Sequence, residues 1–170
     1  PQSVISGRAP IQLGAELFGS NAIEADSEII GLMLSTFECA GVSRPLTLDI
    51  GHIGIYDALF SDAGLEPEVE AQVFDALQRK SVPDIERLSA SLPAREAERL
   101  ARLVSLHGSP DVLASARAAF PDEPAVMAAL DQLDTVLAGV QRAFPDVGVY
   151  VDLTELRGFR YHTGLVFAVY

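Results

Sequence analysis

Cysteine is nearly absent from this sequence, since Cys39 is the only one among 170 residues. A disulfide framework or a thiolate metal site needs at least two cysteines, so neither can be built within the chain. Cys39 falls on what the pattern indicates is the apolar face of a helix. These features fit a reducing compartment, and the cytoplasm is the expected location.

Basic residues are also scarce: 12 Lys and Arg stand against 24 Asp and Glu, which gives a net charge of −12. Such a surface repels phosphate backbones and anionic headgroups, so we expect neither a nucleic-acid nor a membrane partner. No apolar run is long enough to cross a bilayer, and the first residues do not combine a basic start with an apolar core. A soluble protein without a targeting segment is expected.

Histidine occurs three times, at His52, His107 and His162. Their neighbours supply no compact metal-ligand spacing, so we expect no metal and no cofactor. His52 and His107 are expected to be structural, whereas His162 belongs to a motif described below.

The chain has what a folded core needs, because 49% of its 170 residues are hydrophobic. That length and composition predict one compact domain over residues 1–170. No repeat, low-complexity tract or rich linker divides it.

The first part of the chain predicts strand, helix and strand in turn. Residues 11–18 alternate between apolar and polar side chains, which indicates a strand. Asn21 can cap a helix, with Glu24 as its capping-box partner, and helical spacing then continues over residues 22–40. A second alternating strand covers residues 46–50, and a short helix follows it.

A helical block of about residues 66–144 comes next, punctuated by prolines at helix starts. Its clearest helix, over about residues 123–143, carries an apolar stripe at spacings of four and three. Alternation returns at residues 147–153, and residues 165–170 are nearly all apolar. The order predicts an α/β domain in which the helical block is inserted between strands of one sheet.

Two segments carry candidate binding residues. Gln12 and Glu16 share a strand face with Gly14 between them, so a ligand could lie against the bare backbone there, but an ordinary solvent-facing strand is the favoured alternative. Residues 157–164 gather arginines, a tyrosine, a histidine and a threonine in one short loop, which suits a carboxylate ligand. A surface turn with incidental charges fits those residues equally well.

A family resemblance bears on both segments. Residues 157–164, Arg-Gly-Phe-Arg-Tyr-His-Thr-Gly, resemble the Arg-Gly-Leu-Asp-Tyr-Tyr-Thr-Gly motif of histidyl-tRNA synthetases, and an apolar strand follows in both. Residues 12–19, Gln-Leu-Gly-Ala-Glu-Leu-Phe-Gly, resemble the Gln-x-Gly-x-Glu-x-x-Gly strand of that family's motif 2. The resemblance implies a class II synthetase-like domain: a mostly antiparallel sheet with an inserted helical block, here a partial core.

The same resemblance implies a histidine-binding set of five residues. Gln12 would meet the amino group of the ligand and Glu16 its imidazole. Arg157 would meet the carboxylate or an adjoining phosphate, and Tyr161 and His162 would line the pocket. No catalytic residue is assigned.

Two departures separate this chain from true synthetases. Arg160 stands where the family has an acidic residue, and His162 replaces the second tyrosine. The form Tyr-His-Thr-Gly-Leu-Val-Phe resembles instead the regulatory subunits of ATP phosphoribosyltransferase, synthetase paralogues that lost aminoacylation. Residues 48–55, Leu-Asp-Ile-Gly-His-Ile-Gly-Ile, are similar to the same paralogue.

Parts of the synthetase machinery are not found in this sequence. Motif 1, the first strand of motif 2 and the arginine-bearing motif 3 are missing, and adenylate formation needs cations at the developing phosphate charge. This segment alone is not expected to activate an amino acid. Further sheet strands are expected outside it, because the outer strands would otherwise leave apolar edges unprotected.

The resemblance therefore implies a regulatory function rather than an enzymatic one. The expected protein binds histidine and activates and feedback-regulates the catalytic subunit of a short-form ATP phosphoribosyltransferase, the first enzyme of histidine biosynthesis. A homodimer within a hetero-oligomer is expected. Two alternatives stay open: a fragment of a histidyl-tRNA synthetase, and a scaffold domain that lost its pocket.

Overall fold

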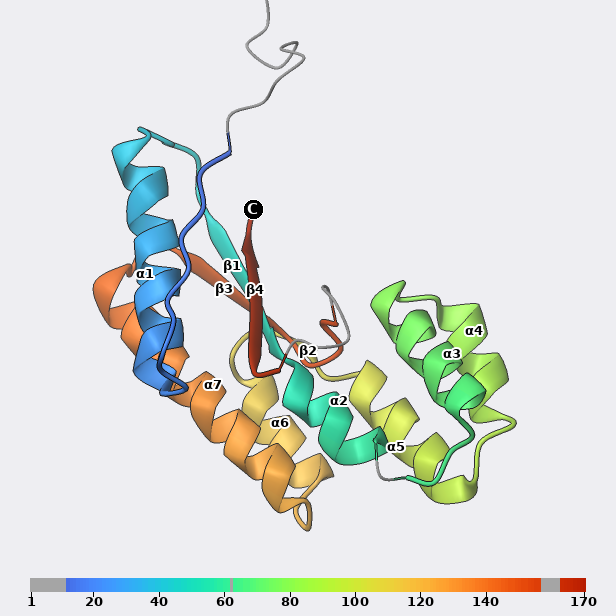
Figure 1. Cartoon of the computed structure of the whole chain (residues 1–170). Helices are drawn as coiled ribbons and strands as arrows, with labels where there is room; N and C mark the ends of the chain where they lie inside the picture. The colour runs from blue at the N-terminus through green and yellow to red at the C-terminus, as the bar shows by residue number, and fades with distance from the viewer. Residues whose placement is uncertain (1–11, 62, 157–162) are drawn as a thin grey trace, which may run out of the picture.

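A computed structural model describes residues 12–61, 63–156 and 163–170. In these residues, helices surround a four-stranded mixed sheet (Figure 1). The helices are α1 (Ile23–Cys39), α2 (Ile53–Phe60), α3 (Pro67–Gln78), α4 (Val82–Ser89), α5 (Ala94–Val104), α6 (Val112–Ala119) and α7 (Pro124–Ala143). The strands are β1 (Thr47–His52), β2 (His107–Gly108), β3 (Gly148–Asp152) and β4 (Leu165–Val169).

The sheet has the strand order β2-β3-β1-β4. β1 pairs parallel with β3 and antiparallel with β4, and β2 pairs antiparallel with β3. Two of the three pairings are thus antiparallel, which agrees with the expected α/β fold and its mostly antiparallel sheet. The helical block connects the parallel strands β1 and β3, because parallel neighbours need a long crossover.

The two faces of the sheet differ in what covers them. Leu48 and Ile50 of β1 are fully buried and join the core that α1 and α7 complete (Figure 1). Because side chains alternate along a strand, Asp49 lies on the opposite face, beside Tyr150 of β3. The face away from α1 and α7 therefore carries Asp49, Tyr150 and Asp152, whereas His52 of β1 bonds to Gln132 of α7.

Helical spacing predicted the longest helices closely. α1 falls within the expected residues 22–40, and every member of the α7 stripe is buried: Val126, Leu130, Leu133, Leu137 and Val140. The expected cap was wrong. The N-cap is Ala22, whose backbone N–H donates to Ser20 Oγ at 3.2 Å, and no side-chain hydrogen bond caps α1.

Three further expectations are corrected. Residues 12–18 form no strand, and Leu13 is 80% exposed. A strand needs a partner for its backbone groups, and none of the described strands pairs with this segment, so alternation alone could not make one. Cys39 is exposed, and it is the last residue of α1. The helical block also contains β2, which is too short to produce an alternating signal.

Candidate functional site

The predicted ligand residues divide between the described and the undescribed parts of the chain. Gln12 and Glu16 are described, and both are exposed on the extended segment that precedes α1. Arg157, Tyr161 and His162 lie outside the described residues. Whether these five residues meet around one ligand stays a prediction.

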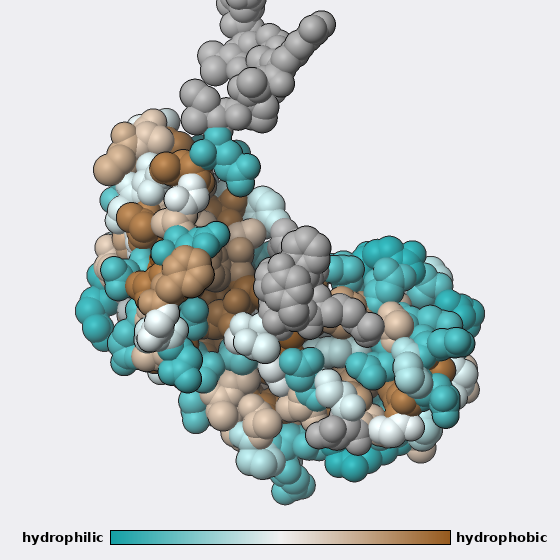
Figure 2. Space-filling model, in the orientation of Figure 1, coloured by the Kyte–Doolittle hydropathy of each residue, from teal (hydrophilic) through white to brown (hydrophobic). Residues whose placement is uncertain are grey.

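An apolar groove borders the segment between Gln12 and Glu16. Its volume is about 550 Å³, and it lies between that segment, α1 and β4. The lining residues are Leu13, Gly14, Ala15, Ile29, Leu32, Met33, Thr36, Phe37 and Phe167. Figure 2 shows apolar residues gathered around this segment and α1, whereas hydrophilic residues cover α3 and α4. The segment therefore adjoins an apolar groove and not the polar face of the sheet.

The end of the predicted ligand loop is fixed to the sheet. Gly164 has a φ of +82°, a conformation that favours glycine, and its carbonyl accepts a hydrogen bond from Ile53 N at 2.9 Å. β4 begins at the next residue, Leu165, which lies opposite His52 of β1. The chain thus leaves the loop at the junction of β1 and α2.

His52 holds that junction together. Its Nδ1 accepts a hydrogen bond from Gly54 N at 3.1 Å, so its Nε2 carries the proton and donates to Gln132 Oε1 at 2.8 Å. Burial lowers the pKa of His52, although Gln132, Asp26 and Asp57 oppose that shift. The neutral ring fits the structural role expected of this histidine.

The start of the loop is fixed by a buried acidic turn, Asp152 to Leu156. Asp152 Oδ1 accepts hydrogen bonds from Thr154 N at 2.8 Å and Thr154 Oγ1 at 2.7 Å. The side chains of Asp152 and Glu155 are only 3% and 4% exposed. Two buried carboxylates need compensation, because an unpaired buried charge costs several kcal/mol, on the order of 3–5 kcal/mol.

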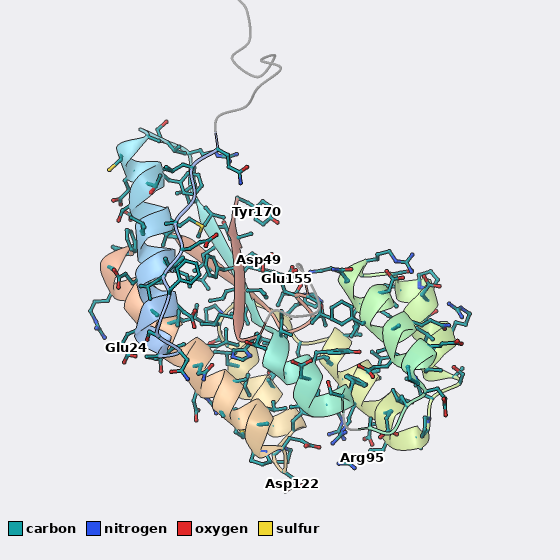
Figure 3. All side chains as sticks on the ribbon, in the orientation of Figure 1. Glu24, Asp49, Arg95, Asp122, Glu155 and Tyr170 are labelled. Carbon is teal, nitrogen blue, oxygen red and sulfur yellow. The ribbon has the colours of Figure 1, made fainter. Side chains whose placement is uncertain are left out.

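Lys80, between α3 and α4, supplies that compensation. Its ammonium group donates to Asp152 Oδ2 and lies 3.8 Å from Glu155 Oε2. Burial alone would lower the pKa of Lys80, but Asp152, Glu155 and Asp49 outweigh it and raise that pKa above its ordinary value. Figure 3 labels Asp49, which belongs to β1, and Glu155, which belongs to the acidic turn.

The carboxylate of Asp152 responds in the opposite sense. Burial would raise its pKa, but the hydrogen bonds from Lys80 and Thr154 hold the pKa below its ordinary value.

Sequence reasoning missed Lys80, Asp152 and Glu155. The acidic residues could have been noticed because they lie two and five positions before Arg157 in the sequence. Nothing marks Lys80, which is 72 residues from Asp152.

A smaller cavity of about 170 Å³ lies beside Lys80, between the helical block and β3. His107 Nδ1 and the hydroxyl of Tyr150 form a 2.8 Å hydrogen bond at its edge. His107 thus has a partner on the neighbouring strand, as expected for a structural histidine.

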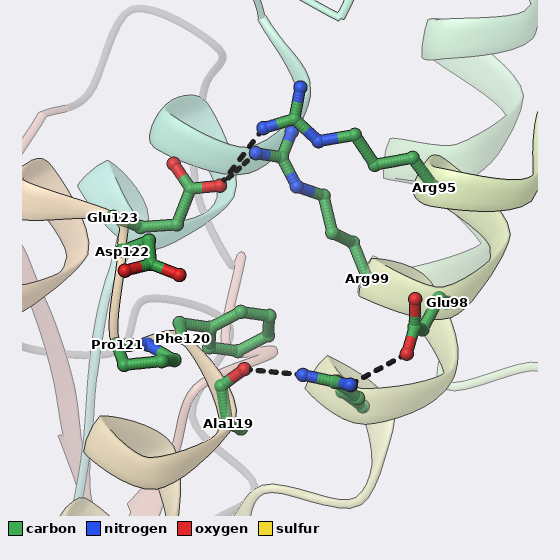
Figure 4. A pocket seen from close by; sticks show the side chains of 9 residues that line it. Arg95, Glu98, Arg99, Ala119, Phe120, Pro121, Asp122 and Glu123 are labelled. Atoms are coloured by element: carbon green, nitrogen blue, oxygen red, sulfur yellow. Dashed lines mark hydrogen bonds and ion pairs between the residues drawn. The ribbon is translucent and has the colours of Figure 1, made fainter.

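A third cavity, of about 280 Å³, lies between α5 and the turn that precedes α7 (Figure 4). Arg95 and Arg99 both reach Glu123, and Arg102 donates to Glu98 Oε1 and to the carbonyl of Ala119. Each guanidinium group is paired with protein oxygens. The arrangement joins elements of the helical block and does not make a free anion site.

The described ranges were also searched for metal and membrane features. Within them, no group of three His, Cys, Asp or Glu side chains could hold a metal ion. No helix in this part of the chain is both long and apolar enough to cross a membrane.

Residues 1–170 match the family model described as histidyl-tRNA synthetase. The chain belongs to the histidyl-tRNA synthetase family. Two curated relatives carry the name "ATP phosphoribosyltransferase regulatory subunit". The relative from Marinobacter nauticus is 48% identical over 172 residues, which cover 100% of this chain and 44% of that protein. The relative from Ectopseudomonas mendocina is 46% identical, with 100% of this chain and 43% of that protein covered.

Solved structures of the histidyl-tRNA synthetase family share the fold. An ATP phosphoribosyltransferase regulatory subunit/histidyl-tRNA synthetase from Bacillus halodurans has a TM-score of 0.76 at 28% identity, covering 89% of this chain and 40% of that one. The ATP phosphoribosyl transferase (HisG:HisZ) complex from Thermotoga maritima has a TM-score of 0.68 at 23% identity, covering 88% and 52%. These likenesses confirm the expected class II synthetase-like fold. The chain spans less than half the length of the two curated relatives.

Proposed function

We propose that the protein containing this chain is a regulatory subunit of ATP phosphoribosyltransferase that binds histidine and controls a separate catalytic subunit. The observation that carries the proposal is the 46–48% identity, over the whole of this chain, to relatives with that name. The 23% identical neighbour in a HisG:HisZ complex supports the fold only.

The same family also contains synthetases, so a fragment of a histidyl-tRNA synthetase is the second candidate. Arg160 and His162 favour the regulator, because both depart from the synthetase motif. We therefore expect the full-length protein to show no histidine-dependent exchange of pyrophosphate into ATP. Exchange above the no-histidine background would favour the synthetase.

Feedback control requires histidine to bind two states of the assembly with different affinities. By linkage, the catalytic subunit must then change the histidine affinity of the regulator by the same factor. In the proposed site, Gln12 meets the amino group, Glu16 the imidazole and Arg157 the carboxylate, with Tyr161 and His162 beside them.

The partner can be tested by affinity purification of the tagged full-length protein from its host lysate. We expect mass spectrometry to identify the catalytic subunit of ATP phosphoribosyltransferase, and the purified pair to be inhibited by histidine. Recovery of tRNA without a phosphoribosyltransferase would contradict the proposal.

The ligand can be tested by titration calorimetry of the full-length protein with histidine. Glu16→Gln removes one charge-assisted hydrogen bond of roughly 1.5–3 kcal/mol, so the affinity should fall about 10- to 150-fold. Glu24→Gln is the matched control, because Glu24 is also exposed but belongs to the first turn of α1. Its affinity should stay within about twofold of the parent. Equal losses of histidine affinity in the two variants would show that Glu16 does not contact the ligand.

A further inference from the structure

The two ends of segment 157–162 are attached to different parts of the fold. On the far side, Gly164 and β4 are hydrogen-bonded to β1 and to the start of α2. On the near side, Gln78 Nε2 donates to the carbonyl of Leu156 at 3.2 Å, and Lys80 binds Asp152 and Glu155. The sheet therefore fixes one end, and the turn between α3 and α4 holds the other.

The backbone of Lys80 adopts a conformation that is unusual for lysine. Lys80 has a φ of +52°, and it is the one residue other than glycine with a positive φ in the described ranges. Its N–H donates to Leu77 O at 2.9 Å, and Ser81 N donates to Ala76 O at 3.0 Å. These two bonds form a Schellman motif, in which glycine is the usual residue at the position of Lys80.

A lysine at that position carries a conformational cost of roughly 1–2 kcal/mol that glycine would avoid. What the lysine adds is its ammonium group, which is the cation that the structure pairs with Asp152 and Glu155. Its side chain is 51% exposed, so it contributes little apolar burial. The strained residue is therefore explained by the two buried carboxylates and not by the helix end.

We propose that Lys80 is a positioning residue for histidine binding: by holding Asp152 and Glu155, it fixes the acidic turn that precedes residue 157 and couples α3 and α4 to histidine binding. This inference rests on the proposed function, since it concerns the affinity for histidine. A displacement of the α3–α4 turn, for example by a partner subunit, would be transmitted through Lys80 to the residues directly before Arg157.

Lys80→Gly is the decisive variant, because glycine keeps the Schellman turn and removes the lysine side chain together with its ammonium group. In the full-length protein we expect calorimetry to show histidine affinity lowered about 2- to 30-fold, the range for coupled residues outside a ligand contact. Lys80→Arg retains the charge and should recover most of the affinity. Arg79→Met is the matched control, because the neighbouring Arg79 pairs with Asp75 and Asp84 of α3 and α4 themselves and not with the acidic turn. It should bind as the parent does.

A second measurement separates failure of this inference from failure of the proposed function. Amide hydrogen exchange at Thr154 and Glu155 reports the turn directly, because both amides donate to Asp152. Lys80→Gly should speed exchange there but not in α7. If the parent binds histidine and Lys80→Gly binds equally well, the inference is overturned. Unchanged exchange at the Thr154 and Glu155 amides in Lys80→Gly would also overturn the role of Lys80. If the parent does not bind histidine, the proposed function itself fails.

Discussion

Gly51 of β1 lies against the acidic turn Asp152 to Leu156. A single methyl group at Gly51 should displace that turn. A Cβ at this position would lie 2.4 Å from the carbonyl oxygen of Asp152 and 2.8 Å from Glu155 Cβ. The first of these atoms belongs to the backbone, so no side-chain rotation can relieve the clash. Gly51→Ala must therefore shift the strand β1 or the turn against it.

The magnitude follows from two opposing effects. Overpacking of a well-packed site costs about 1–3 kcal/mol, and a backbone clash this close belongs at the upper end. Alanine lowers the entropy of the unfolded chain relative to glycine, which offsets about 0.4–1 kcal/mol. We expect a net loss of about 2 kcal/mol, which lowers the Tm by about 4–8 °C for a domain of this size.

Gly139→Ala is the matched control, because Gly139 is exposed in α7 and its Cβ would meet nothing within 4 Å. Alanine in an exposed helix interior should stabilise by about 0.5–1 kcal/mol and raise the Tm. Thermal unfolding of the full-length variants, followed by circular dichroism, gives both values. A Tm for Gly51→Ala equal to or above that of the parent would refute the reasoning.

Two further predictions concern buried polar groups. Arg99, whose side chain is 12% exposed, donates to Leu59 O at 2.8 Å and binds Glu123, so Arg99→Met should lower the unfolding free energy in urea by about 2 kcal/mol. Arg95→Met, at a side chain 71% exposed, should change it by less than about 0.5 kcal/mol, and equal effects would contradict the assignment. Burial lowers the pKa of His52 below 6.5, so the unfolded chain takes up its proton first and stability is lost as the pH falls below about 6.5. Below pH 6.5 the Tm of His52→Gln should fall less steeply than that of the parent. Parallel curves of Tm against pH would show that protonation of His52 does not contribute to the loss of stability.

Periodicity along the sequence predicted four of the elements of this protein. The stripe of α7, the alternation of β1 and β3 and the apolar run of β4 each reveal which side chains must leave water, and the structure confirms all four elements. The same kind of pattern failed at residues 11–18, where the described segment is extended but unpaired. A strand also needs a neighbour, and the pattern within one segment does not contain it.

The site divides in the same way. Family motifs in the sequence named Gln12, Glu16 and the loop that follows Leu156, because those residues are contiguous in short runs. Only the tertiary structure brought Lys80 to Asp152 across 72 residues. Local pattern records which face of an element is apolar, whereas the pairing of charges across the fold depends on how the elements pack.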